Sequence, residues 1–317
     1  MPPLRICVLG GTGFLGSELV AQLASAGHWV RVPTRALSHA QHLSVLPTVE
    51  IAAVDIHEPR VLGELLAGMD VAINLVGILN ERSGARFREV HVELVAKLIE
   101  EMRIAQVRRL LHMSALGADA EHAPSRYLRT KGQAEALLRA ASQQLEFTIF
   151  RPSVIFGSGD SLTRRFVGLL RLAAGVLPLA RAHARFAPVY VGDVAAAFVS
   201  ALRDRSTFGR AYELCGPDVL TLEQIVRAAA AAAGERCRIL ALPDVLARLQ
   251  ALVLGLVPGK PFTLDNFRSL TLDSICRENG FAPLGIEPQR MAAVLPTYLG
   301  SLTVAARLDR LRASGER

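Results

Sequence analysis

Short apolar runs alternate with longer amphipathic segments over the first half of the chain. The runs are rich in Val, Ile and Leu, which is typical of buried parallel strands. The segments between them repeat apolar residues at three- and four-residue spacing, which indicates helices with one buried face. This alternation predicts an α/β fold, a Rossmann-type doubly wound parallel sheet. The predicted strands lie at 6–9, 28–33, 49–54, 71–75, 109–113 and 147–150, and the clearest helices at 15–23, 86–102 and 125–138.

Three glycines follow the first predicted strand with a spacing of G-x-x-G-x-x-G. A strand, a glycine turn and a helix together present backbone N–H groups and a positive helix end to a pyrophosphate. The ordinary dinucleotide fingerprint is G-x-G-x-x-G, so a tight loop without a ligand is the alternative. The position between strand and helix favours nucleotide binding. The residues expected to bind are Gly10, Thr12, Gly13, Phe14, Leu15 and Gly16.

The end of the second strand carries arginine where an NAD-binding fold usually carries an acid. That acid would hold the ribose 2′-hydroxyl. No acid stands here, and Arg31 and Arg35 occupy the region. An arginine can grip a 2′-phosphate, although a solvated surface arginine is the alternative. We therefore expect NADP(H) rather than NAD(H), with Arg35 as the phosphate ligand.

A serine, a tyrosine and a lysine form the candidate catalytic set. Ser114 follows the fifth strand, where α/β sheets bind ligands, and Tyr127 and Lys131 lie four apart on one helix face. A lysine ammonium close to the tyrosine would lower the phenol pKa by about two units from its usual value near 10. Tyr127 would then donate a proton to a substrate carbonyl as hydride arrives, while Ser114 polarises the same oxygen. The alternative is an ordinary helix surface, because Y-x-x-x-K also arises by chance.

Composition limits the class of protein and its partners. The formal charge of +7 favours an acidic partner such as a phosphorylated cofactor or an anionic membrane surface. The basic residues are dispersed and not interleaved with aromatics, so nucleic acid is not expected. The four cysteines form no C-x-x-C pair, so we expect no disulfide framework, no metal site and a reducing compartment. With no signal peptide and no apolar stretch of about 18 residues, a cytoplasmic location is expected, with the inner-membrane surface as a peripheral alternative.

Several segments in order resemble the extended and atypical short-chain dehydrogenase/reductases related to the NADPH-binding accessory subunit of respiratory complex I and its bacterial relatives. They are the glycine loop, V-R-V-P-T-R, I-N-L-V-G, S-R-Y-L-R-T-K, R-P-S-V-I-F-G and P-V-Y-V-G-D-V, between residues 10 and 194. The resemblance implies bound NADPH and places Tyr127 and Lys131 beside the nicotinamide. It implies an adenine contact at Asp55 and Ile56, although Asp55 could instead cap a helix beginning near Pro59. It also assigns the cofactor segments Leu75, Val76 and Gly77, and Pro152 and Val154.

The C-terminal part is expected to form a smaller, mostly helical substrate or lid region. We predict a dinucleotide-binding core over 1–180, returning elements over 186–215 and the smaller region over 216–317. The leucine-rich segment 242–257 is a lid in the favoured interpretation and a membrane- or partner-binding amphipathic helix in the other. A helix is expected within 261–272, with Thr263 as its cap.

These observations favour an NAD(P)-dependent oxidoreductase acting on a carbonyl or quinone-like small molecule, linked to the respiratory chain or ubiquinone metabolism. Two alternatives stay open. One is a non-catalytic accessory or assembly protein of a respiratory complex, in which the nucleotide only stabilises the fold. The other is a nucleotide-sugar epimerase or dehydratase. Such an enzyme shares the Y-x-x-x-K motif but requires NAD and an acid at the position of Arg35.

Overall fold

The structure is a computed structural model that describes residues 2–58, 60–81, 86–257 and 260–300. The chain divides into two compact units. The first contains residues 1–152, 192–214 and 277–287, and the second contains 153–191, 215–276 and 288–317. Residues 153–180, expected within the core, thus belong to the second unit.

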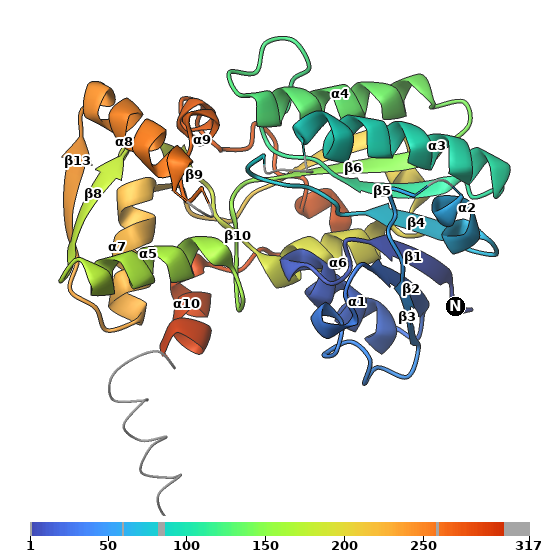
Figure 1. Cartoon of the computed structure of the whole chain (residues 1–317). Coiled ribbons are helices and arrows are strands. Elements are labelled where there is room, and N and C mark those ends of the chain that lie inside the picture. The colour runs from blue at the N-terminus through green and yellow to red at the C-terminus, as the bar shows by residue number, and fades with distance from the viewer. Residues whose placement is uncertain (1, 59, 82–85, 258–259, 301–317) are drawn as a thin grey trace, which may run out of the picture. The chain divides into compact units, whose positions relative to one another are not determined.

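A seven-stranded parallel sheet forms the centre of the first unit (Figure 1). Its order is β11-β6-β5-β4-β1-β2-β3, and every neighbouring pair runs parallel. The Rossmann-type prediction is confirmed, and each of the six expected strands is present. The strands are β1 (Arg5–Leu9), β2 (Trp29–Thr34), β3 (Val49–Ala53), β4 (Val71–Asn74), β5 (Arg109–Met113), β6 (Glu146–Pro152) and β11 (Arg210–Leu214).

Helices cover both faces of this sheet. Leucines and valines of α2 (Val61–Leu66), α3 (Leu94–Ile104) and α4 (Arg126–Ala140) pack into one core with the apolar strand residues. Figure 1 shows α1 (Phe14–Ser25) and α6 (Val191–Ala201) on the other face. A π-helical turn, Glu89–Glu93, precedes α3 directly, and short 3₁₀ turns occupy Leu37–His39, Arg205–Thr207 and Ala282–Leu284.

The strand order places a switch point between β1 and β4. The chain moves from β1 outward to β2 and β3, then returns across β1 to β4 and continues in the opposite direction. In such sheets the ligand crevice lies outside the carboxyl ends of the strands at this point. The glycine loop follows β1, and the I-N-L-V-G segment begins in the last two residues of β4 and continues past its end, so the fold brings both to this edge.

The second unit combines three two-stranded sheets with five helices in its described part. β7 (Ile155–Phe156) pairs with β10 (Val189–Tyr190), β8 (Val176–Ala180) with β13 (Arg238–Leu242), and β9 (Arg185–Phe186) with β12 (Leu220–Thr221). The helices are α5 (Ser161–Leu172), α7 (Leu222–Ala232), α8 (Asp244–Leu256), α9 (Leu264–Ser269) and α10 (Met291–Leu299). The predicted cap at Thr263 is confirmed: its side chain and that of Asn266 form a reciprocal capping box on α9.

The expectation about cysteines was wrong for one pair. Cys215 and Cys276 form a disulfide across a sequence separation of 61 residues. The two lie where the chain leaves and rejoins the first unit, positions that spacing along the sequence does not bring together. Cys7, buried in β1, and Cys237 are free thiols.

None of the helices that the structure describes combines the length and the apolar character needed to span a lipid bilayer.

Candidate functional site

The glycine loop packs directly against the segment after β4. Gly10 has a φ of +80°, a left-handed conformation that favours glycine. A Cβ placed on Gly10 would lie 3.2 Å from the carbonyl carbon of Leu75 and from the nitrogen of Val76. The turn therefore needs glycine both for its backbone angle and for this close approach. Two predicted cofactor segments thus meet at the switch point.

Gly16 allows α1 to approach the loop. A Cβ here would lie 2.2 Å from the Gly10 carbonyl oxygen, so no larger residue fits without moving the backbone. Gly13 is the N-cap of α1 and supplies no side-chain hydrogen bond, and Leu15 anchors the first turn in the core. Thr12 and Phe14 are half-buried beside the exposed Gly13. The arrangement leaves the positive end of a twelve-residue helix at the predicted pyrophosphate site.

The structure distinguishes the two arginines near the end of β2. Arg31 pairs with Glu50 at 3.0 Å and donates a hydrogen bond to the Leu65 carbonyl, also at 3.0 Å. Arg35 follows the strand, is exposed, and forms no ion pair within the described residues. The Arg31 guanidinium therefore already binds groups on neighbouring elements, while the exposed Arg35 guanidinium could bind a phosphate.

Asp55 and Ile56 follow β3, which is separated from β4 by the two strands β1 and β2. Asp55 Oδ1 accepts a hydrogen bond from the His57 nitrogen at 3.0 Å, which forms a turn. Asp55 does not cap the next helix, because α2 begins at Val61 with Arg60 as its N-cap; Pro59 lies outside the described residues. Ile56 and Val76 pack against the same core cluster. The adenine role of Asp55 stays a prediction.

The segment after β4 is held in place by two buried side chains. Asn74 Oδ1 accepts a hydrogen bond from the Val76 nitrogen at 3.0 Å, and its amide nitrogen lies 3.3 Å from His112 Nδ1. His91, in the π-helical turn, accepts at Nε2 from the Ile78 nitrogen at 3.1 Å. Its Nδ1 lies 2.9 Å from Thr130 Oγ1, next to Lys131. His91 thus joins this segment to α4.

The Nε2 acceptor role of His91 requires the neutral ring with its proton on Nδ1. Burial is the main reason that the pKa of His91 falls to about 2, and the positive charge of Lys131 contributes. His91 therefore positions its neighbours and does not exchange protons near neutral pH.

Lys131 lies under the segment after β4. Its Nζ donates to the Met113 carbonyl at the end of β5, at 2.9 Å, and would lie 3.1 Å from a Cβ placed on Gly77. The side chain is buried. Desolvation lowers the pKa of Lys131 to about 8, although the negative charge of Glu135 opposes the change. The ammonium is thus desolvated at the carboxyl edge of β4 and β5.

Tyr127 differs from the sequence-based expectation. Its pKa is raised by desolvation, to about 12, rather than lowered by the lysine. The reason is that Lys131 Nζ is directed at the Met113 carbonyl, and burial outweighs any field that it exerts on the phenol. The ring lies edge-on to His91 and Phe87, with centroid distances of 5.6 and 6.0 Å. Tyr127 is consequently a protonated phenol at neutral pH.

Ser114 is buried and bonded to an acid that the sequence analysis did not identify. Its Oγ donates to Glu135 Oε1 at 2.6 Å. Glu135 also accepts two hydrogen bonds from the Arg151 guanidinium, one of them from Nε at 2.8 Å. Glu135 lies one helical turn beyond Lys131 on α4, so its four-residue spacing from Lys131 could have identified it in the sequence as a residue on the same helix face. The Ser114 hydroxyl thus donates its hydrogen to the Glu135 carboxylate in the structure.

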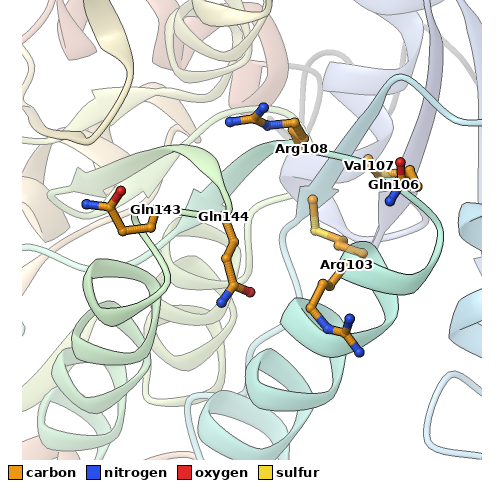
Figure 2. Close-up of a pocket in the computed structure, with 7 residues that line it drawn as sticks. Arg103, Gln106, Val107, Arg108, Gln143 and Gln144 are labelled. Carbon is orange, nitrogen blue, oxygen red and sulfur yellow. The ribbon is translucent and has the colours of Figure 1, made fainter.

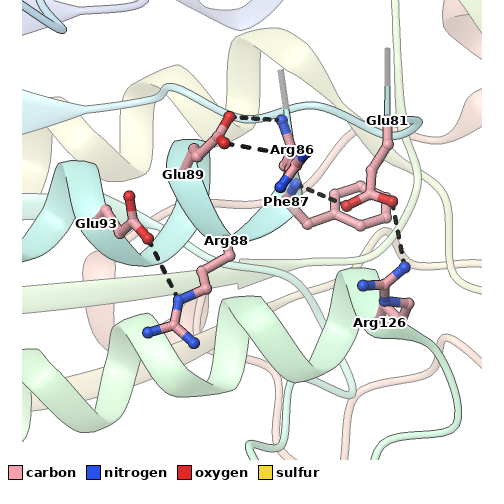
Figure 3. A network of polar contacts seen from close by, with 7 residues as sticks. All are labelled: Glu81, Arg86, Phe87, Arg88, Glu89, Glu93 and Arg126. Carbon is pink, nitrogen blue, oxygen red and sulfur yellow. Dashed lines mark hydrogen bonds and ion pairs between the residues drawn. The ribbon is translucent and has the colours of Figure 1, made fainter. Parts of the chain in front are cut away.

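A surface network fixes the start of α4 (Figure 3). Glu81 accepts a hydrogen bond from the Phe87 nitrogen at 3.1 Å and lies 3.4 Å from Arg126 Nη1. Arg126 is the first residue of α4 and precedes Tyr127. Glu81 therefore joins the tyrosine's helix to the segment that contributes the Phe87 ring beside it.

Two further predicted cofactor residues fall in different units. Pro152 ends β6 and accepts a hydrogen bond from the Leu116 nitrogen at 3.1 Å. Val154 belongs to the second unit, where its carbonyl accepts from the Val189 nitrogen. The structure thus assembles the predicted residues of the first unit along one sheet edge, and Val154 stays a separate prediction.

A cavity of about 320 Å³ lies at the other edge of the sheet (Figure 2). Its lining comes from the chain just before β5 and just before β6, the amino-terminal ends of these strands. Ligands of doubly wound sheets bind at the carboxyl ends, so this cavity is separate from the candidate site. Its lining residues are Met102, Arg103, Gln106, Val107, Arg108, Gln143 and Gln144.

The fold and the site edge define a dinucleotide-binding protein of the extended short-chain reductase type. The chain belongs to the NAD dependent epimerase/dehydratase family, whose model matches residues 6–215. This confirms the family resemblance found in the sequence motifs and supports binding of an NAD(P) dinucleotide.

Relatives and solved structures agree with this assignment. The chain is 33% identical over 303 residues to the "NADH dehydrogenase [ubiquinone] 1 alpha subcomplex subunit 9, mitochondrial" of Arabidopsis thaliana, covering 90% of this chain and 74% of that protein. It is 33% identical over 241 residues to the ceramide reductase of Caulobacter vibrioides, covering 75% of this chain and 74% of that protein. A UDP-glucuronic acid 4-epimerase structure from Bacillus cereus, with NAD, superposes with a TM-score of 0.71 at 18% identity, covering 94% and 99% of the two chains. At this identity the likeness shows the fold alone.

Proposed function

We propose that the protein is an NADP(H)-dependent reductase acting on a carbonyl or quinone-like substrate. The observation that carries the proposal is a continuous set of close approaches at the switch point. The loop at Gly10 contacts the segment after β4, and Gly77 of that segment lies over the Lys131 ammonium. A dinucleotide along this edge would have its phosphates at α1 and its nicotinamide beside Tyr127 and Lys131.

We further propose the phosphorylated dinucleotide as the cofactor, with Arg35 as the 2′-phosphate ligand. Arg35 is exposed and follows β2, and Arg31 is already paired with Glu50. A guanidinium matches the geometry of a phosphate through two parallel hydrogen bonds. An acid at this position would instead favour the 2′-hydroxyl of NAD.

The protonation states support a reduction. A bound dinucleotide would supply the hydride, and Tyr127 would donate a proton to the substrate oxygen, since its phenol is protonated at neutral pH. Lys131 holds the ribose hydroxyls in its charged form, which predominates below pH about 8. For Ser114 to polarise the same oxygen, its hydroxyl hydrogen must turn from Glu135 to the substrate.

The test is single-turnover consumption of bound NADPH with a panel of short-chain quinones, aldehydes and ketones. We expect Tyr127→Phe to reduce the rate by at least about a hundredfold, the range of general acid catalysis, without weakening NADPH binding. Tyr212→Phe is the matched control, because it removes a hydroxyl from β11 in the same unit. An unchanged rate in Tyr127→Phe would refute the catalytic assignment.

The main alternative is a non-catalytic accessory or assembly protein of a respiratory complex. It is favoured by the 33% identity to a protein named as a subunit of NADH dehydrogenase. On this alternative NADPH binds tightly, no acceptor is reduced, and Tyr127→Phe complements a deletion strain fully. A sugar epimerase has less support, because Arg35 occupies the position at which an NAD-dependent enzyme requires an acid to bind the ribose 2′-hydroxyl.

A further inference from the structure

Helix α8 of the second unit exposes its large apolar side chains and buries its small ones. Its fully buried residues are Ala247 and Ala251, which pack with Ala180 and Phe267. Surface helices ordinarily show the reverse pattern, with Leu and Val toward the core. The exposed apolar residues of α8, called here the docking face, are Val245, Leu246, Leu249, Leu252, Val253 and Leu256, exposed by 48% to 88%.

The docking face is one continuous surface. Val245, Leu249, Leu252 and Leu256 recur at helical spacing, which places them in one stripe along the helix. A contiguous exposed stripe of this size on a single helix marks an interaction site, whereas scattered exposed leucines do not.

The neighbouring two-stranded sheet extends this surface. Alternate residues of a strand share a face, and Ala180 of β8 and Leu242 of β13 pack into the same cluster as α8. Val176 and Leu240 therefore lie on that side as well, and both are exposed, by 37% and 47%. Arg238 shares the same alternation on β13.

The charge of the chain is concentrated in the unit that carries the docking face. Over the described residues, the second unit has 12 Lys and Arg against 7 Asp and Glu, whereas the first has 19 Lys and Arg against 20 Asp and Glu. The described part of the second unit thus carries a formal charge of +5, and that of the first a charge of −1. Arg238 and Arg248 are exposed at this surface and form no ion pair within the described part of the chain.

We propose that the docking face binds the second unit to the surface of an anionic lipid bilayer. Apolar side chains on one helix face with arginines at its border are the features of an interfacial amphipathic helix. A second copy of the chain would bring two units of the same positive charge together, which repel each other. At 13 residues, α8 is about 20 Å long, shorter than the ~30 Å apolar core of a bilayer, so it would lie in the interface plane.

The test is flotation of the full-length protein with lipid vesicles. One set contains phosphatidylcholine with phosphatidylglycerol, and the other contains phosphatidylcholine alone. We expect binding to the anionic vesicles that weakens as salt is raised, because salt screens the arginines. Leu249→Ser with Leu256→Ser should weaken binding at least about tenfold, since each side chain loses apolar burial.

Two further variants test the separate contributions. Arg238→Gln with Arg248→Gln should weaken binding to anionic vesicles roughly twenty-five-fold, at about fivefold for each basic residue near the surface. Leu172→Ser is the matched control: Leu172 is 87% exposed, like Leu256 at 88%, but its helix α5 packs on the other face of β8 through Leu170, Leu177 and Leu179. It should bind like the wild type.

The proposal does not depend on catalysis, and NADPH affinity should be the same in all these variants. Wild-type protein that stays at the bottom of the gradient with anionic vesicles would overturn the proposal. Loss of binding in Leu172→Ser equal to that of the double leucine variant would also overturn it. A third result would overturn it as well. Light scattering would show that the protein forms a dimer or a complex with a protein partner, the leucine variants would dissociate that assembly, and neither the wild type nor the variants would bind vesicles.

Discussion

Replacing Lys131 by methionine should make the first unit more stable and the protein inactive. Burial lowers the pKa of Lys131 from 10.5 to about 8. At about 1.4 kcal/mol for each pKa unit, keeping the charge in the folded protein costs about 3 kcal/mol at pH 7. The variant also loses the hydrogen bond from Nζ to the Met113 carbonyl, a charge-assisted bond that contributes about 1.5 kcal/mol. A net gain of about 1.5 kcal/mol in the free energy of unfolding is therefore expected at pH 7.

The pH dependence of the free energy of unfolding tests the same reasoning independently. Between pH about 8 and 10.5 the unfolded chain holds the lysine proton while the folded protein releases it. Since the unfolded state binds more protons there, the stability of the wild type rises with pH across this window. Lys131→Met should lack this rise. The advantage of the variant should thus be largest below pH 8 and change sign above pH 10.5, where the wild type no longer holds a buried charge but keeps its hydrogen bond to the Met113 carbonyl.

The assay is urea unfolding followed by tryptophan fluorescence at a series of pH values. Trp29 is the single tryptophan of the chain and begins β2, so its signal reports the first unit. NADPH oxidation is measured on the same samples. A variant less stable than the wild type at pH 7, or one whose stability rises with pH in parallel with it, would refute the reasoning about desolvation.

Three other outcomes are expected. Gly16→Ala should abolish binding of NADPH and NADH alike in calorimetry, because the added Cβ would lie 2.2 Å from a backbone oxygen. Gly168→Ala is the control: a Cβ added there has no atom within 4 Å, so this variant should bind both nucleotides normally. Arg35→Ala should weaken NADPH binding by roughly tenfold to a hundredfold, the loss of one charge-assisted contact, and leave NADH unchanged; equal losses for both nucleotides would contradict the phosphate assignment. Cys276→Ser should lower the free energy of unfolding by about 4 kcal/mol, from the entropy of closing a 61-residue loop, and a reductant should then change only the wild type in denaturant titrations.

Local patterns in the sequence determined the fold class and much of the site edge. The strands, the glycine turn and the four-residue spacing of Tyr127 and Lys131 follow from periodicity and backbone geometry over a few residues. The parallel sheet then follows from alternating strands and helices, because parallel neighbours need a crossover. For these reasons the expected positions at Gly10, Leu75 and Lys131 meet at one edge in the structure.

Packing between elements that are distant in the sequence sets which side chains are paired, buried or exposed. Arg31 and Arg35 look equivalent in the sequence, but only the first finds Glu50 on the neighbouring strand. The pKa of Tyr127 rises instead of falling, because the direction of a lysine side chain and the desolvation of a phenol depend on packing from other elements.

The same holds for contacts between distant segments. The pairing of Cys215 with Cys276 and the bond from Ser114 to Glu135 join residues whose separation in space no local pattern encodes. Hydropathy along α8 shows an apolar helix, but it does not say which side is covered. That side is set by the neighbours that pack on Ala247 and Ala251, and they leave the leucines facing outward.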